Sequence, residues 1–473
     1  MSLSRRDALN LGLVGGATAL LAGCGPISRR VAAYENQSTP TAPKQDVSHE
    51  VRLLNRAAFG PSAADLAAVK EQGAAAWVDA QLRADAEEDF SLQMQIRRLD
   101  VFQMGGMELR DIPENKVLEQ LQQAAILRAC YSKNQLHERM TDFWTNHFNI
   151  YGRKGFAAYR KANDETKVIR KHALGSFPEM LRASARSPAM LAYLDNRFSR
   201  DGVPNENYAR ELMELHTLGV NGGYTHHDID EVARCFTGWT LETGLWGRGN
   251  FKFDPDRHDK GQKLVLGKVI PAGGGIEDGD RVIKILCEHP QTAHFISRKL
   301  CRYMLGTDHD GWVDRTAKTF LATKGDIAAM IRPMLLSDDL ASHPVVLKRP
   351  FDMMISGLRA TGAQTDGGTP LMAHLEEMGQ PLYQWPMPDG YPDKNSAWTG
   401  NMLPRWNFAF ALAEGRIGGT ELPLKGTDPL ELASAVLCRP VAALGAELTR
   451  ALRGQTTSMA IALSLASPDF QWR

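Results

Sequence analysis

Apolar residues recur every three or four positions over most of the chain, the spacing that gathers them on one face of an α-helix. Residues 62–83 show this pattern after Pro61, and residues 114–151 show it over a longer stretch. The same spacing predicts further helices at residues 176–185, 209–219, 280–305, 326–337, 350–362, 404–417 and 458–468.

Alternation of apolar and polar residues, which is typical of a β-strand, is confined to residues 250–270. Phe251 and Phe253 alternate with polar residues, a polar turn follows, and Leu264 and Leu266 alternate again. We interpret this segment as a β-hairpin. The predicted fold class is therefore all-α, mainly helical, with one small β-hairpin insertion.

The first residues have the pattern of an export signal. Arg5 and Arg6 precede an apolar run at residues 9–22, which is shorter than the roughly 20 residues that span a membrane. The paired arginines resemble the twin-arginine (Tat) signal, and the four residues that end at Cys24 resemble a lipobox, whose cysteine is acylated. We expect residues 1–24 to be a Tat-type lipoprotein signal peptide with Cys24 as the lipid anchor; the alternative is a cleaved signal with an incidental cysteine.

Residues 25–49 are rich in Ser, Thr, Pro and Gln without periodicity, so we expect a flexible tether. A single large helical domain is expected over residues 50–473. Gly25 follows the anchor where aspartate would favour retention in the inner membrane, so a periplasmic lipoprotein of the outer membrane is the favoured location. Tat cargo crosses the membrane folded, often with a cofactor inserted, which keeps a divalent metal among the alternatives.

Composition excludes one class of partner. The chain carries 55 Lys+Arg and 55 Asp+Glu and has no basic tract, whereas nucleic-acid binding needs concentrated positive charge. Five cysteines remain after Cys24; they are scattered and odd in number, so no disulfide framework is implied, although a single bridge stays open. We expect the membrane, through the anchor, to be the first partner, and no nucleic acid.

The segment 205–218 concentrates charged side chains on one helix face. Asn207, Arg210, Glu211 and Glu214 lie at i, i+3, i+4 and i+7, whereas Tyr208, Leu212 and Leu215 form a separate core stripe. Two carboxylates one turn apart could ligate a metal or act as an acid–base pair. The alternative is an arginine that pairs with its neighbours on a wet surface. Thr225 and Asp228 then form a capping box for the next helix.

Two histidines are further candidates. His147 lies in an aromatic stretch, so we expect it to be buried, either as a satisfied core histidine or as a ligand or base. His258 and Asp259 are adjacent in the polar turn of the predicted hairpin, with Lys263 entering the second strand. The turn resembles a calcium loop in its alternating acids but lacks the glycine and the terminal glutamate of that motif.

Several segments together resemble one known family. In chain order they are LLNRAAFGPS, DFWTNHF, NENYARELMELHTLGVNGGYT, DEVARCFTGWT, FDPDRHDKGQKLVLG and WTGNMLPRWN. They are similar to the bacterial family catalogued as domain of unknown function 1800, from about residue 50 to the C-terminal LASPDFQ. The resemblance implies export, often by the Tat route, and it supplies no established activity. The polar and aromatic pattern of the family falls here on Trp144, Asn146, His147, Asn205, Glu206, Asn207, Arg210, Glu211, Glu214, Thr237, Gly238, Trp239, His258, Asp259, Gly261 and Lys263.

Shared polar residues are harder to explain by packing than shared apolar ones. We hypothesise that Glu211, Glu214, His147, His258 and Asp259 converge on one cleft as catalytic residues. Glu211 and Glu214, with His147, are the candidate ligands of a divalent metal that would activate water; alternatively, one carboxylate is a general acid and another a base. Candidate substrate-binding residues are Asn207, Arg210, Lys263, Trp239 and Arg405. This set suits a hydrolase or lyase that acts on an envelope or extracellular polymer.

A second class of function remains open. The same residues could form a buried polar network in a lipoprotein that scaffolds or escorts another exported protein. The family resemblance implies a partner of this kind, because members are often encoded beside an exported family similar to alkaline phosphatases and sulfatases. A phosphotransferase that uses Lys263, His258 and Asp259 is the weaker alternative, since no glycine-rich phosphate loop precedes them.

Overall fold

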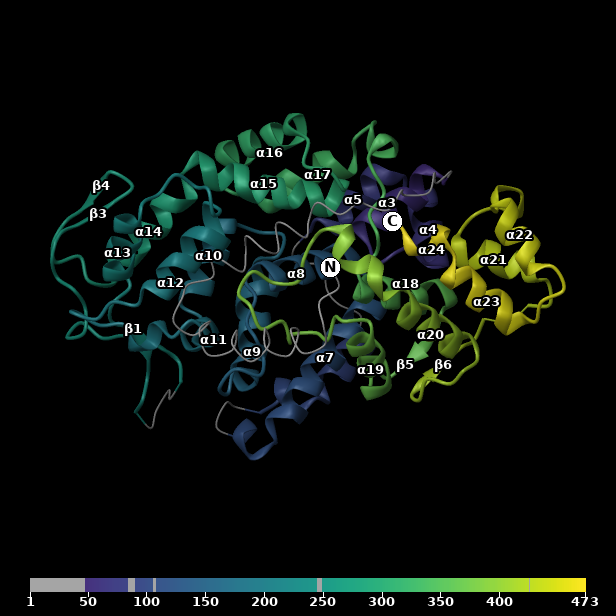
Figure 1. The fold of residues 1–473 in the computed structure, drawn as a ribbon, viewed down its shortest axis with the longest axis horizontal. Helices are drawn as coiled ribbons and strands as arrows, with labels where there is room; N and C mark the ends of the chain where they lie inside the picture. The colour runs from purple at the N-terminus through teal and green to yellow at the C-terminus, as the bar shows by residue number, and fades with distance from the viewer. Residues whose placement is uncertain (1–46, 84–89, 105–107, 245–248, 425) are drawn as a thin grey trace, which may run out of the picture. The chain divides into compact units, whose positions relative to one another are not determined.

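Helices carry most of the chain in the computed structural model, which describes residues 47–83, 90–104, 108–244, 249–424 and 426–473 (Figure 1). The predicted all-α class with a small β component is confirmed. Among the described residues, 47–393 and 401–473 belong to one compact unit, and residues 394–400 belong to a second. The expected signal peptide, the anchor Cys24 and the tether up to residue 46 lie outside the described residues.

The N-terminal part of the large unit begins with short helices and leads into a long pair. These elements are α3 (His49–Ala57), α4 (Ala63–Gln72), α5 (Ala74–Gln81), α6 (Phe90–Arg97), η1 (Asp100–Phe102), η2 (Glu108–Asp111), α7 (Glu114–Tyr131) and α8 (Gln135–His147).

The middle part contains most of the strands. Its helices are α9 (Ala158–Asp164), η3 (Glu165–Arg170), α10 (Phe177–Ala185), α11 (Pro188–Tyr193), η4 (Asn196–Phe198), α12 (Glu206–Glu211), η5 (Leu212–Thr217), α13 (His226–Cys235), α14 (Ile276–Cys287), α15 (Pro290–Leu305), α16 (Asp310–Thr323), α17 (Ile327–Leu335) and η6 (Leu340–Ser342). Its strands are β1 (Trp239–Leu241), β2 (Phe251–Phe253), β3 (Lys263–Val265) and β4 (Lys268–Ile270).

The C-terminal part is again helical. It comprises α18 (Pro350–Thr361), β5 (Gln364–Thr365), α19 (Thr369–Glu377), α20 (Met402–Ala413), β6 (Thr420–Glu421), α21 (Pro429–Leu437), η8 (Val441–Ala443), α22 (Ala446–Leu452), α23 (Thr457–Ala466) and α24 (Pro468–Gln471). The 3-10 helix η7 (Asn395–Asn401) belongs almost wholly to the second unit and is described by itself.

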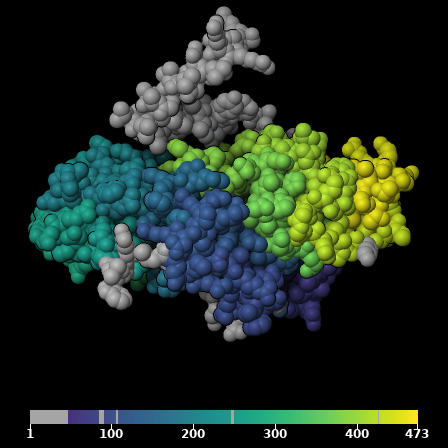
Figure 2. Space-filling view, turned by 90° about the horizontal axis from the view of Figure 1, so that it is seen from below, coloured from purple at the N-terminus to yellow at the C-terminus, as the bar shows by residue number. Residues whose placement is uncertain are grey.

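The large unit has two main hydrophobic cores. One gathers the buried faces of α3, α5, α8 and the helices from α10 to α17, with Trp144, Phe177 and Trp239 fully buried in it. The other gathers α18, α20, α21 and α23, with Phe408 at its centre. In Figures 1 and 2 the teal segments of the first core lie toward one end of this unit and the yellow segments of the second core toward the other, and in Figure 1 the helices α3, α5 and α8 of the first core lie between them.

The long helix predicted at residues 114–151 is wrong in one respect, because the chain breaks it into α7 and α8. The hydroxyl of Ser132 accepts a hydrogen bond from the Asn134 amide at 3.1 Å, and the buried Gln135 side chain donates to the carbonyls of Ala129 and Ser132. These bonds satisfy the open helix end that a break creates. The predicted helix at residues 62–83 is likewise broken, at Gly73, whose φ of +83° suits glycine.

The strands pair differently from the predicted hairpin. β2 pairs antiparallel with the earlier β1, and β3 pairs antiparallel with the later β4. The residue pattern identified both strand segments but not their partners, since alternation specifies a face and leaves the neighbour open. A third two-stranded ladder joins β5 and β6.

Two helices contain π-helical turns, η3 and η5. A π turn adds a residue to the helical repeat and is frequent at functional sites. No helix among the described residues combines the length and the apolar character needed to cross a bilayer. The five cysteines of the described chain, Cys130, Cys235, Cys287, Cys301 and Cys438, are free thiols.

Candidate functional site

The carboxylate-bearing segment is a continuous helix formed by α12 and the π turn η5. Asn205 caps it, as predicted, and its side chain accepts the Tyr208 amide at 3.0 Å. The π turn shifts the buried face after Leu212, so Met213 and His216 are buried and the predicted core residue Leu215 is only half-buried. Glu211 is the last residue before this shift. Glu211 is buried, whereas Glu214, which lies within the π turn, is half-buried.

Glu211 is the most perturbed carboxyl group of this helix. Its residue is 5% exposed, and burial, followed by the negative charges of Glu214 and Asp389, raises its pKa to about 7 against the opposing charge of Arg210. Within the described residues its carboxylate forms no hydrogen bond or ion pair. A buried acid with this pKa and no fixed partner holds its proton in half of the molecules near neutral pH.

Glu214 lies nearer the surface, with 24% of its side chain exposed. Arg210 reaches both ways along the helix, 3.7 Å from the carboxylate of Glu214 and 3.7 Å from that of Glu206. The negative charge of Glu214 also helps to raise the pKa of the Tyr224 hydroxyl, after burial, which is the larger cause. Arg210 and the two carboxylates therefore lie along one helix as predicted, but Glu211 is buried and Glu214 is only half-buried.

His147 is a buried, neutral imidazole with both ring nitrogens engaged. It is 1% exposed; Nε2 lies 3.2 Å from the His216 carbonyl, and Nδ1 lies 3.0 Å from the Lys299 ammonium. The ammonium donates to Nδ1, so Nε2 carries the proton and donates to the carbonyl. Burial and the charge of Lys299 lower the pKa of His147 well below its usual range. His147 thus connects the aromatic stretch of α8 to Lys299, a residue that the sequence analysis did not identify.

The loop after α19 supplies the third carboxylate. Asn146 donates to the Tyr391 carbonyl at 2.9 Å and accepts the Tyr391 amide at 2.7 Å, while Asn149 donates to the carbonyls of Trp385 and Met387. Gly390, at φ +76°, packs so closely that a Cβ would lie 2.2 Å from the Asn146 carbonyl oxygen. The asparagines of the DFWTNHFN motif thus hold the loop in place and position Asp389.

Asp389 connects the two halves of the cluster. Its carboxylate accepts a hydrogen bond from the Trp385 indole at 2.9 Å, and its charge raises the pKa of Glu211. It also faces the half-buried Lys299, whose pKa burial lowers against the opposing charges of Asp393 and Asp389. Glu211, Glu214, Asp389, Lys299 and His147 therefore form one electrostatically coupled group, which we call the carboxylate cluster.

The turn residues His258 and Asp259 do not join this cluster. His258 is 3% exposed and places Nδ1 2.8 Å from the Thr237 carbonyl and Nε2 3.3 Å from the Asp278 carboxylate. Lys263 is also buried and donates to Asp278 at 2.7 Å. Arg234 binds the Asp259 carboxylate with two hydrogen bonds, at 2.7 and 3.1 Å.

No hydrogen bond or ion pair of this turn, within the described chain, reaches Glu211, Glu214 or His147. The expected convergence on one open cleft is therefore corrected for His258, Asp259 and Lys263. The physical reason is pairing: buried charges need partners, and Asp278 of α14 lies where it can serve His258 and Lys263 together. This network ties the turn to α13 and α14.

Other candidate substrate-binding residues are also inside the protein. Trp239 is fully buried, with its ring edge-on to Phe236 and Phe251, so it cannot stack on a sugar. Arg405 is fully buried and donates to Gln471 at 3.0 Å. Asn207 is exposed and remains available beside Arg210. Only Asn207 and Arg210 of the predicted binding set can meet a substrate from solvent.

The predicted metal ligands do not fit a preformed site. Across the described residues, the one trio of His, Cys, Asp or Glu whose ligand atoms lie within 4.8 Å of one another is Glu206, His226 and Asp230. That trio is near the surface. His147 cannot ligate a metal in this arrangement, because its Nδ1 accepts from Lys299 and its Nε2 donates to a backbone carbonyl.

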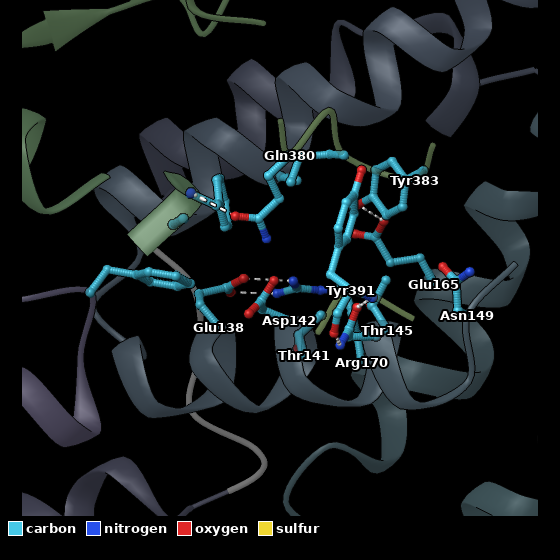
Figure 3. A pocket seen from close by; sticks show the side chains of 16 residues that line it. Glu138, Thr141, Asp142, Thr145, Asn149, Glu165, Arg170, Gln380, Tyr383 and Tyr391 are labelled. Atoms are coloured by element: carbon cyan, nitrogen blue, oxygen red, sulfur yellow. Dashed lines mark hydrogen bonds and ion pairs between the residues drawn. The ribbon is translucent and has the colours of Figure 1, made fainter. Parts of the chain in front are cut away.

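A cavity lies against the face of α8 that carries Glu138, Thr141, Asp142 and Thr145 (Figure 3). About 50 Å³ of it is available to water molecules, and its walls include Thr141, Asp142, Thr145 and Asn149. Arg170 binds Glu138 through two hydrogen bonds of 2.6 and 2.7 Å. Although burial opposes it, the charge of Arg170 holds the pKa of Glu138 well below its usual range.

The remaining acids of this cavity are paired as well. Arg128 binds Glu165 at 2.9 Å, and the Tyr383 hydroxyl donates to the same carboxylate at 2.6 Å. Asp142 pairs with Arg349. Each of these carboxylates thus has a cation beside it. We interpret the cavity as a small water-sized space, whose acids are all paired, next to the loop after α19. Glu211 differs from all of them in having no such partner.

Sequence reasoning missed Lys299, Asp389 and Tyr224. Lys299 lies in an amphipathic helix among other basic residues and has no local signal. Asp389 lies in a Pro-Asp-Gly turn directly before Tyr391, a local turn signal that could have identified it. Tyr224 adjoins the predicted capping box.

Comparison with known proteins gives a family and no activity. The family profile described as "Protein of unknown function (DUF1800)" matches residues 52–472, nearly the whole chain. No curated protein and no solved structure showed a match.

Proposed function

Because the chain belongs to the DUF1800 family, whose description names no activity, we propose its function from its own residues. The protein is an acid–base enzyme, a hydrolase or lyase acting on an envelope or extracellular polymer. The observation that carries this proposal is the Glu211 carboxyl, which is buried, free of hydrogen bonds within the described chain, and has a pKa of about 7. Acids tuned in this way are typical of proton-transfer sites.

Each member of the carboxylate cluster has a role in this proposal. Glu211 gives or takes the proton at the reacting bond. Glu214 and Asp389 are the candidates for the second carboxylate of the site, and their negative charge helps to keep Glu211 protonated. Glycosidic hydrolysis uses such a pair, in which one acid has a raised pKa and its neighbour is ionised. Arg210 and Lys299 supply positive charge for an anionic or polyhydroxylated substrate.

The location is part of the proposal. A Tat-type lipoprotein signal over residues 1–24, acylated at Cys24, would hold the domain in the periplasm, with the outer membrane favoured. The tether of residues 25–49 would let the domain reach polymers near the membrane. Neutral charge balance and the absence of a basic tract suit a carbohydrate or peptide polymer better than nucleic acid.

The experiment compares the full chain with Glu211→Gln and with the matched control Glu206→Gln on the same helix. Each protein is offered peptidoglycan and a panel of envelope polysaccharides, and new reducing ends and unsaturated products are measured. We expect Glu211→Gln to lose about 10²–10⁴-fold in kcat, and the wild-type kcat/KM to change near pH 7, while Glu206→Gln keeps its rate.

A direct titration separates a wrong substrate from a wrong mechanism. The Glu211 carboxyl resonance, assigned by its loss in Glu211→Gln, should titrate near pH 7 in ¹³C NMR spectra of glutamate-labelled protein. A midpoint near the ordinary 4.5 would end the proposal whatever the panel shows, because no tuned acid would then exist.

A scaffold or escort function is the second candidate. The buried network of His258, Lys263 and Asp278 favours it, since a motif shared with the family there serves the fold and not a cleft. Its partner would be an exported protein similar to phosphatases or sulfatases. Co-purification of such a protein with the anchored chain, unchanged in Glu211→Gln, together with no turnover on the panel, would favour this candidate.

A further inference from the structure

A second concentration of charge consists of buried arginines from α3, α8 and α20 together with Arg473. Arg56, Arg139 and Arg405 are each 0% exposed, and Arg473 is 5% exposed. Two of them share one aromatic ring: the guanidiniums of Arg139 and Arg473 lie 4.7 and 5.2 Å from the Tyr303 ring centre. We call these four residues the arginine cluster.

The arginine cluster has too few negative partners. Asp352 forms an ion pair with Arg139 and lies 3.6 Å from Arg473, and among the described residues it is the one side-chain carboxylate within ion-pair distance of a cluster member. Asp142 also acts on Arg139, but it pairs directly with the neighbouring Arg349. The buried Lys348 adds a further positive charge beside Asp352, so positive charge exceeds negative charge in this region.

Many donors of the cluster are also unused. Arg56 gives one hydrogen bond, to the Pro344 carbonyl at 2.5 Å, and Arg473 gives one to the Tyr303 carbonyl at 3.3 Å. In the part of the chain that the structure describes, two nitrogens of each guanidinium have no hydrogen-bond partner. These eight atoms are Nε and Nη1 of Arg56, Nε and Nη2 of Arg139, Nε and Nη2 of Arg405, and Nε and Nη1 of Arg473.

A guanidinium cannot escape this situation by losing its proton, because its intrinsic pKa is above 12. Burial opposes the charged form of all four guanidiniums, although for Arg139 the charges of Asp352, Tyr303 and Asp142 outweigh burial and raise its pKa. Burial, followed by the charges of Arg473, Arg52 and Arg139, lowers the pKa of Arg56 well below its usual range, and burial lowers that of Arg405 to about 10. Water could accept some of the hydrogen bonds, but water supplies no negative charge.

We propose that the arginine cluster binds a free tetrahedral oxyanion, inorganic phosphate or sulfate, enclosed between α3, α8, α20 and the C-terminal residue. Such an anion offers four oxygens to forked guanidinium donors and up to two negative charges, which match both the unused donors and most of the excess charge. Because all four arginines are buried, there is no room on the surface side for the organic part of an ester. The anion would connect segments that belong to the two hydrophobic cores of the large unit.

The experiment uses the full chain in two preparations. The first is purified without buffer exchange and then unfolded, and the released anions are counted by ion chromatography; about one phosphate or sulfate per chain is expected. The second is exchanged into chloride buffer free of phosphate and sulfate, and its thermal unfolding is followed as phosphate, sulfate or extra chloride is added at constant ionic strength. Phosphate or sulfate should raise the midpoint by about 3–5 °C and saturate, whereas chloride should not.

Two variants make the test specific. Arg56→Met removes a guanidinium that has no carboxylate within ion-pair distance and should abolish both the bound anion and the midpoint shift. Arg439→Met is the control, because Arg439 is also buried, at 7% exposed, but is paired with Asp469 at 2.9 Å; it should lower stability and leave the shift intact. If Arg56→Met does not fold, Arg56→Lys keeps the charge without the fork and should weaken the shift. No released anion and no saturable shift in the wild type would overturn the proposal.

Discussion

Substituting Glu211 by glutamine should make the protein more stable in alkaline solution. A carboxyl whose pKa rises from 4.5 to about 7 on folding favours the protonated folded form. This contribution of Glu211 to the free energy of unfolding is complete below pH 4.5 and is lost as the pH rises through 7, where the buried acid ionises. The shift corresponds to roughly 3 kcal/mol at about 1.4 kcal/mol per unit.

Glutamine has nearly the shape of the protonated acid and cannot ionise. The free energy of unfolding of Glu211→Gln should therefore match that of the wild type near pH 4 and exceed it by up to about 3 kcal/mol at pH 8.5. The measurement is urea unfolding followed by circular dichroism at both pH values. The control is Glu206→Gln, a half-exposed glutamate on the same helix 3.7 Å from Arg210, for which a change within about 1 kcal/mol is expected.

The reasoning would be refuted by an equal stability difference at both pH values. That result would mean that the substitution acts through packing alone, and that Glu211 ionises in the folded protein as easily as in the unfolded chain. A smaller but pH-dependent gain would instead measure how far Arg210 offsets the repulsion from Glu214 and Asp389.

Three further predictions concern the supporting residues. Asp278→Asn should cost about 3 kcal/mol in the free energy of unfolding, because it removes the nearer carboxylate of the buried Lys263 and leaves Asp259, 3.8 Å away, as its remaining anionic partner. Asp280→Asn, a half-exposed acid two residues later, should cost about 1 kcal/mol or less by the same urea assay. Gly390→Ala should displace the loop from Asn146 and lower the pKa of Glu211, as read by ¹³C NMR; an unchanged Glu211 titration would show that Asp389 does not act on it. Lys299→Met should raise the pKa of His147 in ¹H–¹⁵N spectra of the imidazole, and no rise would mean that burial alone sets it.

Local chemistry in the sequence determined much of the fold. The capping box of Thr225 and Asp228 and the cap at Asn205 formed where they were predicted, since each needs hydrogen bonds only to residues three positions away. Helical periodicity likewise identified the all-α class, because burying one helix face requires no knowledge of which neighbour covers it. Breaks such as Ser132–Asn134 were missed because the apolar spacing continues across them.

Tertiary structure alone decided the chemistry of the sites. Lys299 reaches His147 across 152 positions, and Asp389 meets Glu211 only because Asn146 and Asn149 hold its loop. The helical spacing placed Glu211 and Glu214 on one face with equal standing, whereas the packed structure buries Glu211 and leaves Glu214 nearer to solvent. Charge effects depend on distance and on exclusion of water, and both are properties of how separate segments pack, which no local pattern of residues encodes.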